Sequence, residues 1–233
     1  MFVPLHDGVP MRFIRVAYVT YALIAICVLL RLMLMHWTSE ASEIAVLAGF
    51  GTIPAVLFGE AQLPPELLKA PPWLTLVTGI LLHASFAHLV GNMLFLWVFG
   101  DNVEDAMGHA RFLVFFFLCG LGGSLFHAGL YPDSQQPLIG ASGAISGVIA
   151  SYLMIYPQVR IWGLAFNWIP IHIPALYALG GWILLQAASA IFGADGNVGW
   201  WAHLGGLGAG AALTPLLIRR ELRLFGRGMR GAP

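Results

Sequence analysis

Three short groups of polar residues stand where apolar segments of the sequence begin, and their residue types suit acyl transfer. They are His83–Asn92, Gly140–Gly143 and Trp200–His203. Ser142 offers a hydroxyl nucleophile and His203 an imidazole base, whereas His88 and Asn92 offer hydrogen-bond donors for an oxyanion. Because strongly polar side chains are costly within a membrane span, these groups are candidates for function.

Each of these residues also has a simpler interpretation when it is taken alone. A serine in a Gly/Ala-rich helix is often a packing residue, and Asn92 could join two helices. A histidine at a helix entrance often lies at the membrane interface. The occurrence of all these residues together favours a functional site. Ser146 is a second candidate nucleophile, but two residues before it stands Ala144, where Ser142 has Gly140.

The composition predicts an integral membrane protein. Of 233 residues, 59% are hydrophobic and 9% are charged, and the mean hydropathy is +0.82. A soluble domain carries about a quarter charged residues, so a water-soluble enzyme is excluded. A span needs roughly 20 apolar residues, which leaves room for several helices but not for a separate soluble domain. We expect a single domain over residues 1–233.

Six apolar runs predict an all-α protein, a bundle of six transmembrane helices. The runs are Phe13–Met35, Leu89–Met107, Phe112–Tyr131, Leu138–Tyr156, Pro174–Phe192 and Trp201–Ile218. The ends of the chain, about 1–12 and 219–233, are expected to be short cytoplasmic tails.

The distribution of charge predicts the orientation. Arg12 and Arg15 flank the first run, and five arginines follow the last, namely Arg219, Arg220, Arg223, Arg227 and Arg230. Positive charge marks the cytoplasmic side, so both termini are expected there. Runs two, four and six then begin on the outer side, which places the three polar groups at one depth. Acidic residues, Asp133 and Asp195 among them, fall in the external loops. Arg31, near the outer end of run one, is expected to extend to the interface.

The segment His36–Phe86 between runs one and two is too long for an ordinary connector. Its Pro64-Pro65 and Pro71-Pro72 pairs and Trp73 predict a structured, partly embedded loop. Irregular backbone at membrane depth needs cover from protein or from a water-filled cavity, so this loop also indicates a wet cavity on the outer side.

The order of these motifs resembles the rhomboid family of intramembrane serine proteases, over nearly the whole chain. A long first loop is followed by His-x4-His-x3-Asn, then by Gly-x-Ser-Gly, and last by Ala-His with small residues after it. The resemblance implies a dyad in which Ser142 is the nucleophile and His203 its general base. It implies an intramembrane endopeptidase that cleaves transmembrane proteins near the outer face.

The resemblance also assigns the surrounding residues. His88 and Asn92 would stabilise the oxyanion together with the Ser142 backbone N–H, and Gly140 would belong to the same oxyanion and substrate site. His83 would support the loop, and Glu104 would be structural. Ser146 stands where some members place a tyrosine on the catalytic histidine, so the imidazole needs another neighbour, Trp200 or Trp201. In the first loop Leu74 follows Trp73, where members often carry Trp-Arg; many lack that pair.

Two further features concern the helices around the dyad. Gly143 with Gly147, and Gly206 with Gly210, are small-xxx-small pairs that allow two membrane helices to approach closely. Packing alone explains them equally well. Run five carries Trp182, Gln186 and Phe192; the resemblance suggests a lateral gate for substrates, and a lipid-facing helix is equally compatible.

The expected partners are the lipid bilayer and single-span or other transmembrane protein substrates, with no nucleic acid, cofactor or metal. We expect the plasma membrane of a prokaryote. Two other functions are considered. A protease-dead relative that escorts membrane clients would usually lack the serine or the histidine, and both are present. A transporter or channel would be expected to show paired intramembrane acids or a symmetric repeat of broken helices, and the sequence shows neither.

Overall fold

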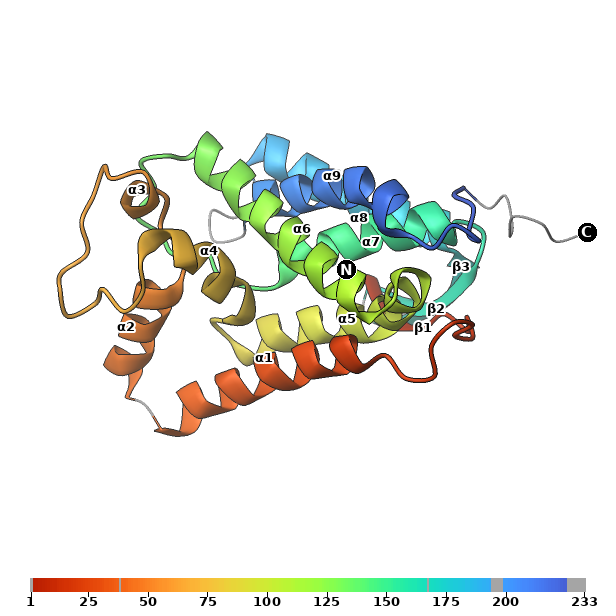
Figure 1. Cartoon of the computed structure of the whole chain (residues 1–233), viewed down its shortest axis with the longest axis horizontal. Helices are drawn as coiled ribbons and strands as arrows, with labels where there is room; N and C mark the ends of the chain where they lie inside the picture. The colour runs from red at the N-terminus through yellow and green to blue at the C-terminus, as the bar shows by residue number, and fades with distance from the viewer. Residues whose placement is uncertain (1, 38, 167, 194–198, 226–233) are drawn as a thin grey trace, which may run out of the picture.

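The computed structural model describes residues 2–37, 39–166, 168–193 and 199–225. Asp195, Arg227 and Arg230 lie outside these ranges. The elements are β1 (Phe2–His6), α1 (Tyr18–Trp37), α2 (Glu40–Phe50), α3 (Pro54–Leu57), α4 (Pro72–Leu81), α5 (Phe86–Met107), α6 (His109–Leu130), α7 (Ser142–Ile155), β2 (Arg160–Ala165), β3 (Ile169–Pro174), α8 (Ala175–Phe192) and α9 (Trp200–Leu217). The long helices run roughly along one axis, with α2–α4 at one end and the strands at the other (Figure 1).

Each of the six apolar runs contains one helix, so the structure is mostly helical as predicted. Among the described residues, α1, α6 and α8 are long and apolar enough to cross a membrane. The pair α4 and α5, bent by 78° at its junction, passes the same test as one unit. The structure therefore contains three to four candidate spans, and α7, with 14 residues, is a shorter apolar helix.

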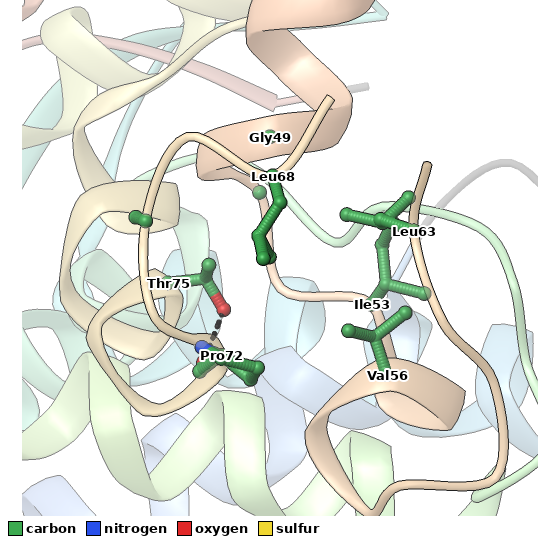
Figure 2. A pocket seen from close by; sticks show the side chains of 9 residues that line it. Gly49, Ile53, Val56, Leu63, Leu68, Pro72 and Thr75 are labelled. Carbon is green, nitrogen blue, oxygen red and sulfur yellow. Dashed lines mark hydrogen bonds between the residues drawn. The ribbon is translucent and has the colours of Figure 1, made fainter. Parts of the chain in front are cut away.

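The described part of the long connection between α1 and α5 contains three helices, α2, α3 and α4, separated by irregular segments. Pro54 and Pro72 stand at the first positions of α3 and α4, where a proline is favoured because no intrahelical N–H bond is lost. Apolar side chains such as Ile53, Val56 and Leu68 surround a small hollow in this connection (Figure 2). Thr75, whose hydroxyl donates to the Pro72 carbonyl at 2.6 Å, also lines it.

Arg31 does not extend freely to an interface as expected. Its side chain is 10% exposed and forms an ion pair with Glu43 of α2. A buried guanidinium needs a partner, because leaving the charge unpaired away from water is costly. The pair therefore ties the C-terminal half of α1 to α2, the first helix of the connection.

A three-stranded antiparallel sheet was not expected from an all-α prediction. The hairpin of β2 and β3 joins α7 to α8, and β1 adds to the free edge of β2, with Phe2 opposite Ala165. The first residues of the chain, expected to be a tail, thus form part of the folded structure. Residues 226–233, within the other expected tail, lie outside the described part.

Two buried carboxylates at the end of α5 hold the chain segment that enters α1. Glu104, which is fully buried, accepts hydrogen bonds from the backbone N–H groups of Val19 and Thr20 at 3.0 and 2.7 Å, and from the Thr20 hydroxyl at 2.7 Å. The first N–H groups of a helix have no partner within it. The Glu104 side chain therefore caps α1, which agrees with the structural role expected for it.

The neighbouring Asp105 holds the residues just before α1. Its two oxygens accept from the N–H groups of Arg12, Phe13 and Ile14 at 2.7–2.9 Å. Together the two carboxylates fix the chain against α5 from Arg12 to Thr20.

Replacing Glu104 with Gln should lower the free energy of unfolding by about 1–3 kcal/mol, because one oxygen becomes an NH2 group that faces backbone donors. The apparent melting temperature in detergent measures this effect. Asp133→Asn, a similar change at an exposed loop residue, should leave the melting temperature unchanged. Equal melting temperatures for the two variants would contradict this account of Glu104.

Candidate active site

The backbones of α7 and α9 lie in direct contact. A Cβ atom placed on Gly206 would overlap the Gly143 carbonyl, and one placed on Gly210 would lie 2.5 Å from the Gly147 Cα. Only glycine permits this approach. The contact expected from the two small-xxx-small pairs is therefore present, and it runs along successive turns of both helices.

This contact brings Ser142 and His203 together. Ser142 is the first residue of α7, and His203 lies in the first turn of α9. The Ser142 Oγ lies 2.8 Å from His203 Nε2, within hydrogen-bond distance, and His203 is 9% exposed. An imidazole that accepts a hydrogen bond from a serine hydroxyl can take the proton when the oxygen attacks a carbonyl carbon.

The opposite side of the His203 ring contacts α8. Its Nδ1 lies 2.7 Å from the Gln186 amide oxygen. The Trp182 ring stacks on it with centroids 6.5 Å apart and planes at 24°. Trp200 meets it edge-on at 5.8 Å, whereas Trp201 packs on Phe126 instead.

From the sequence, Trp182 and Gln186 are predicted as residues of a possible gate and not as neighbours of His203. The available signal for contact with His203 was their spacing, since residues four apart share one face of a helix. The spacing alone does not show which helix this face of α8 packs against.

His88, Asn92 and Gly140 form a second side of the site. Gly140 has a positive φ of 116°, and a Cβ atom there would lie 2.6 Å from His88 Cε1 and 3.7 Å from Asn92 Nδ2. Asn92 is 8% exposed, and its Nδ2 has no hydrogen-bond partner within the described residues. A buried amide donor without an acceptor is costly, so it marks a place where an oxygen atom can be bound.

The remaining predicted residues take supporting positions. His83 is 1% exposed, and its ring lies edge-on to His88 with centroids 5.2 Å apart, so it can restrict the His88 ring. Ser146, the other candidate nucleophile, is fully buried, and its hydroxyl donates to the Ser142 carbonyl at 2.7 Å. That bond lies within α7.

Comparison with known proteins identifies close similarity to one family. The model of the rhomboid domain matches residues 70–220. The chain is 32% identical to YdcA of Bacillus subtilis over 158 residues, covering 66% of this chain and 71% of YdcA. It is 32% identical to the rhomboid protease GluP of Bacillus subtilis over 136 residues, which cover 58% of this chain and 24% of GluP.

A third relative comes from another bacterium. The rhomboid protease AarA of Providencia stuartii is 29% identical over 179 residues, which cover 68% of this chain and 62% of AarA. The chain thus spans less than two thirds of both GluP and AarA.

Gly206→Ala should slow fluorophosphonate labelling of Ser142 by about 10²-fold, since a shift near 1 Å at reacting groups costs this much. The added carbon would push α9 away from α7. Gly208→Ala is the matched control, because a Cβ atom there meets nothing within 4 Å. Labelling is measured on the purified protein in detergent. If both variants label at the wild-type rate, the glycine contact does not set the distance between Ser142 and His203.

Proposed function

Since the chain belongs to the rhomboid family of intramembrane serine proteases, we propose that it cleaves transmembrane proteins with Ser142 as nucleophile and His203 as general base. Family membership makes the chain a membrane-bound hydrolase of the serine-protease type. The observation that supports the dyad is the 2.8 Å hydrogen bond between Ser142 Oγ and His203 Nε2. Ser142 begins α7, and His203 lies in the first turn of α9.

The reaction proceeds through an acyl-enzyme. His203 Nε2 takes the hydroxyl proton as Ser142 Oγ attacks the carbonyl carbon of the substrate, which forms a tetrahedral oxyanion. His203 then gives the proton to the leaving amine as the peptide bond breaks. A water molecule attacks the resulting ester by the same route, and Ser142 regains its proton. The neutral form of His203 is required, so the rate should fall at low pH.

The oxyanion is stabilised by donors on two elements. The Ser142 backbone N–H is in the first turn of α7, where N–H groups lack intrahelical partners and the helix dipole favours negative charge. Asn92 Nδ2 of α5 is buried without an acceptor among the described residues. His88 borders the same space beside Gly140. Donors fixed in place before the reaction stabilise developing charge at little cost in reorganisation.

We propose that α1, α5, α6, α7, α8 and α9 all span the membrane, with both termini in the cytoplasm and the site near the outer face. The six apolar runs support this assignment, and the positively charged residues near the ends of the chain support the orientation. The plasma membrane of a bacterium is the proposed location, as bacterial relatives suggest.

Substrates would enter from the lipid and present an unwound segment to Ser142. Glycine or proline in the substrate helix favours unwinding, because both residues weaken helices. Helix α8 is the proposed gate. Phe192, at the end of α8, is 85% exposed, which is equally compatible with a helix that simply faces lipid.

Ser142→Ala should abolish cleavage of a single-span model substrate by the purified protein. Ser146→Ala should retain most of the activity, because the Ser146 hydroxyl bonds within α7 and not to His203. Cleavage products are followed by gel electrophoresis, and labelling by a fluorophosphonate should be lost only in Ser142→Ala. Undiminished cleavage by Ser142→Ala would refute the dyad, and would favour Ser146 if the second variant were inactive.

Asn92→Leu should lower kcat by about 10²–10³-fold, the usual cost of losing one oxyanion donor. KM should change little, because the donor acts mainly on the transition state. Gly91→Ala is the control, since a Cβ atom at this neighbouring position meets nothing within 4 Å. Steady-state kinetics on the same substrate give both constants. An unaltered kcat in Asn92→Leu would remove Asn92 from the oxyanion site.

A further inference from the structure

Helix α8 contributes one buried polar side chain to the site, and that side chain contacts the imidazole. Gln186 is 5% exposed, and it is the only polar residue of Ala175–Phe192 that is buried; the other buried residues of α8 are Ala175, Ala178, Leu179 and Ala190. The Gln186 Oε1 lies 2.7 Å from His203 Nδ1. A helix that only faced lipid would not need an amide at this position.

We propose that Gln186 is a positioning residue that holds His203 in the tautomer required of the base, so that the dyad is competent only while α8 is in place. This inference rests on the proposed role of Ser142 and His203. It goes beyond that role, because a two-residue dyad has no third group on the imidazole.

The tautomer follows from the inventory of donors and acceptors. A neutral imidazole carries one N–H and one lone pair, and which nitrogen carries the proton is set by its partners. The Gln186 oxygen can only accept, so Nδ1 carries the hydrogen. Nε2 then presents its lone pair to the Ser142 hydroxyl. After proton transfer the Nδ1–H bond to Gln186 persists, and it stabilises the imidazolium. An amide serves the same purpose in Cys-His-Asn proteases.

A second residue of α8 fixes the plane of the His203 ring. Trp182 precedes Gln186 by four residues, so the two side chains project from one face of α8. The Trp182 ring stacks on the imidazole while Gln186 binds its edge. The Ser142–His203 distance, in contrast, depends on the glycine contact between α7 and α9. Displacement of α8 would therefore leave Ser142 and His203 close together but release the orientation of the ring.

Three variants of α8 separate this role from simple packing. Gln186→Leu keeps a side chain of similar volume and removes the acceptor. Gln186→Glu keeps an acceptor and adds a negative charge beside Nδ1. Leu185→Ala alters the neighbouring residue, which is 55% exposed, and controls for disturbance of α8. Cleavage of a single-span model substrate is measured in detergent across a range of pH, and Ser142→Ala is run in parallel.

Gln186→Leu should lower kcat on the order of 10²-fold with little change in KM, as expected for a misoriented base. Gln186→Glu should recover most of the loss. The acid limb of its pH–rate profile should move to higher pH, because a carboxylate beside Nδ1 favours the imidazolium form of His203. His88 of α5 and His127 of α6 also influence the charge on His203. Both histidines are present in every variant, so a difference between the pH–rate profiles is caused by the substitution at residue 186. Leu185→Ala should behave as the wild type.

The outcomes distinguish this proposal from the proposed function. Wild-type kcat in Gln186→Leu, with Ser142→Ala inactive, overturns the role of Gln186 and leaves the dyad intact. Cleavage by Ser142→Ala overturns the dyad itself. If Gln186→Leu fails to fold, as judged by its melting temperature, Gln186→Glu decides alone: an acid limb identical to that of the wild type overturns the proposal, and a shift to higher pH supports it.

Discussion

Two stretches of backbone, one in α7 and one in α9, lie against each other with no side chain between them. Gly143 and Gly147 face Gly206 and Gly210, and a single added carbon at Gly206 would overlap the chain opposite. A serine side chain is short, so its hydroxyl reaches an imidazole on another helix only where the two backbones are this close. The hydrogen bond between Ser142 and His203 depends on this contact, and the remaining parts of the site are arranged around that bond.

Polar groups at the two ends of α5 differ in how they are satisfied. At one end, the carboxylates of Glu104 and Asp105 accept hydrogen bonds from backbone N–H groups of the chain that enters α1. At the other end, the Asn92 amide is buried with a donor unpaired in the described part of the chain. A buried polar group costs free energy unless it is bonded. The first set therefore supports the fold, and the second suits a transient acceptor.

The helices could be predicted from the sequence because hydrophobic runs are a local property. The sheet could not. Phe2 pairs with Ala165, and a pairing across that separation leaves no signal in either segment alone. Arg31 is a similar case: the sequence indicates a costly charge near a span end, but its ion pair with Glu43 depends on how α2 packs against α1.

The sequence by itself determined that the chain lies in a membrane and which residue types could carry out acyl transfer, because hydropathy and side-chain chemistry belong to individual residues. It also indicated that Ser142, His203, His88 and Asn92 lie at one depth. Only the tertiary structure decided which of these groups touch. Gln186 and Trp182 were visible as residues of α8, but their contact with His203 arises from the packing of α8 on α9. Helix packing depends on all neighbours at once, so the partner of the imidazole could not be read from any single segment.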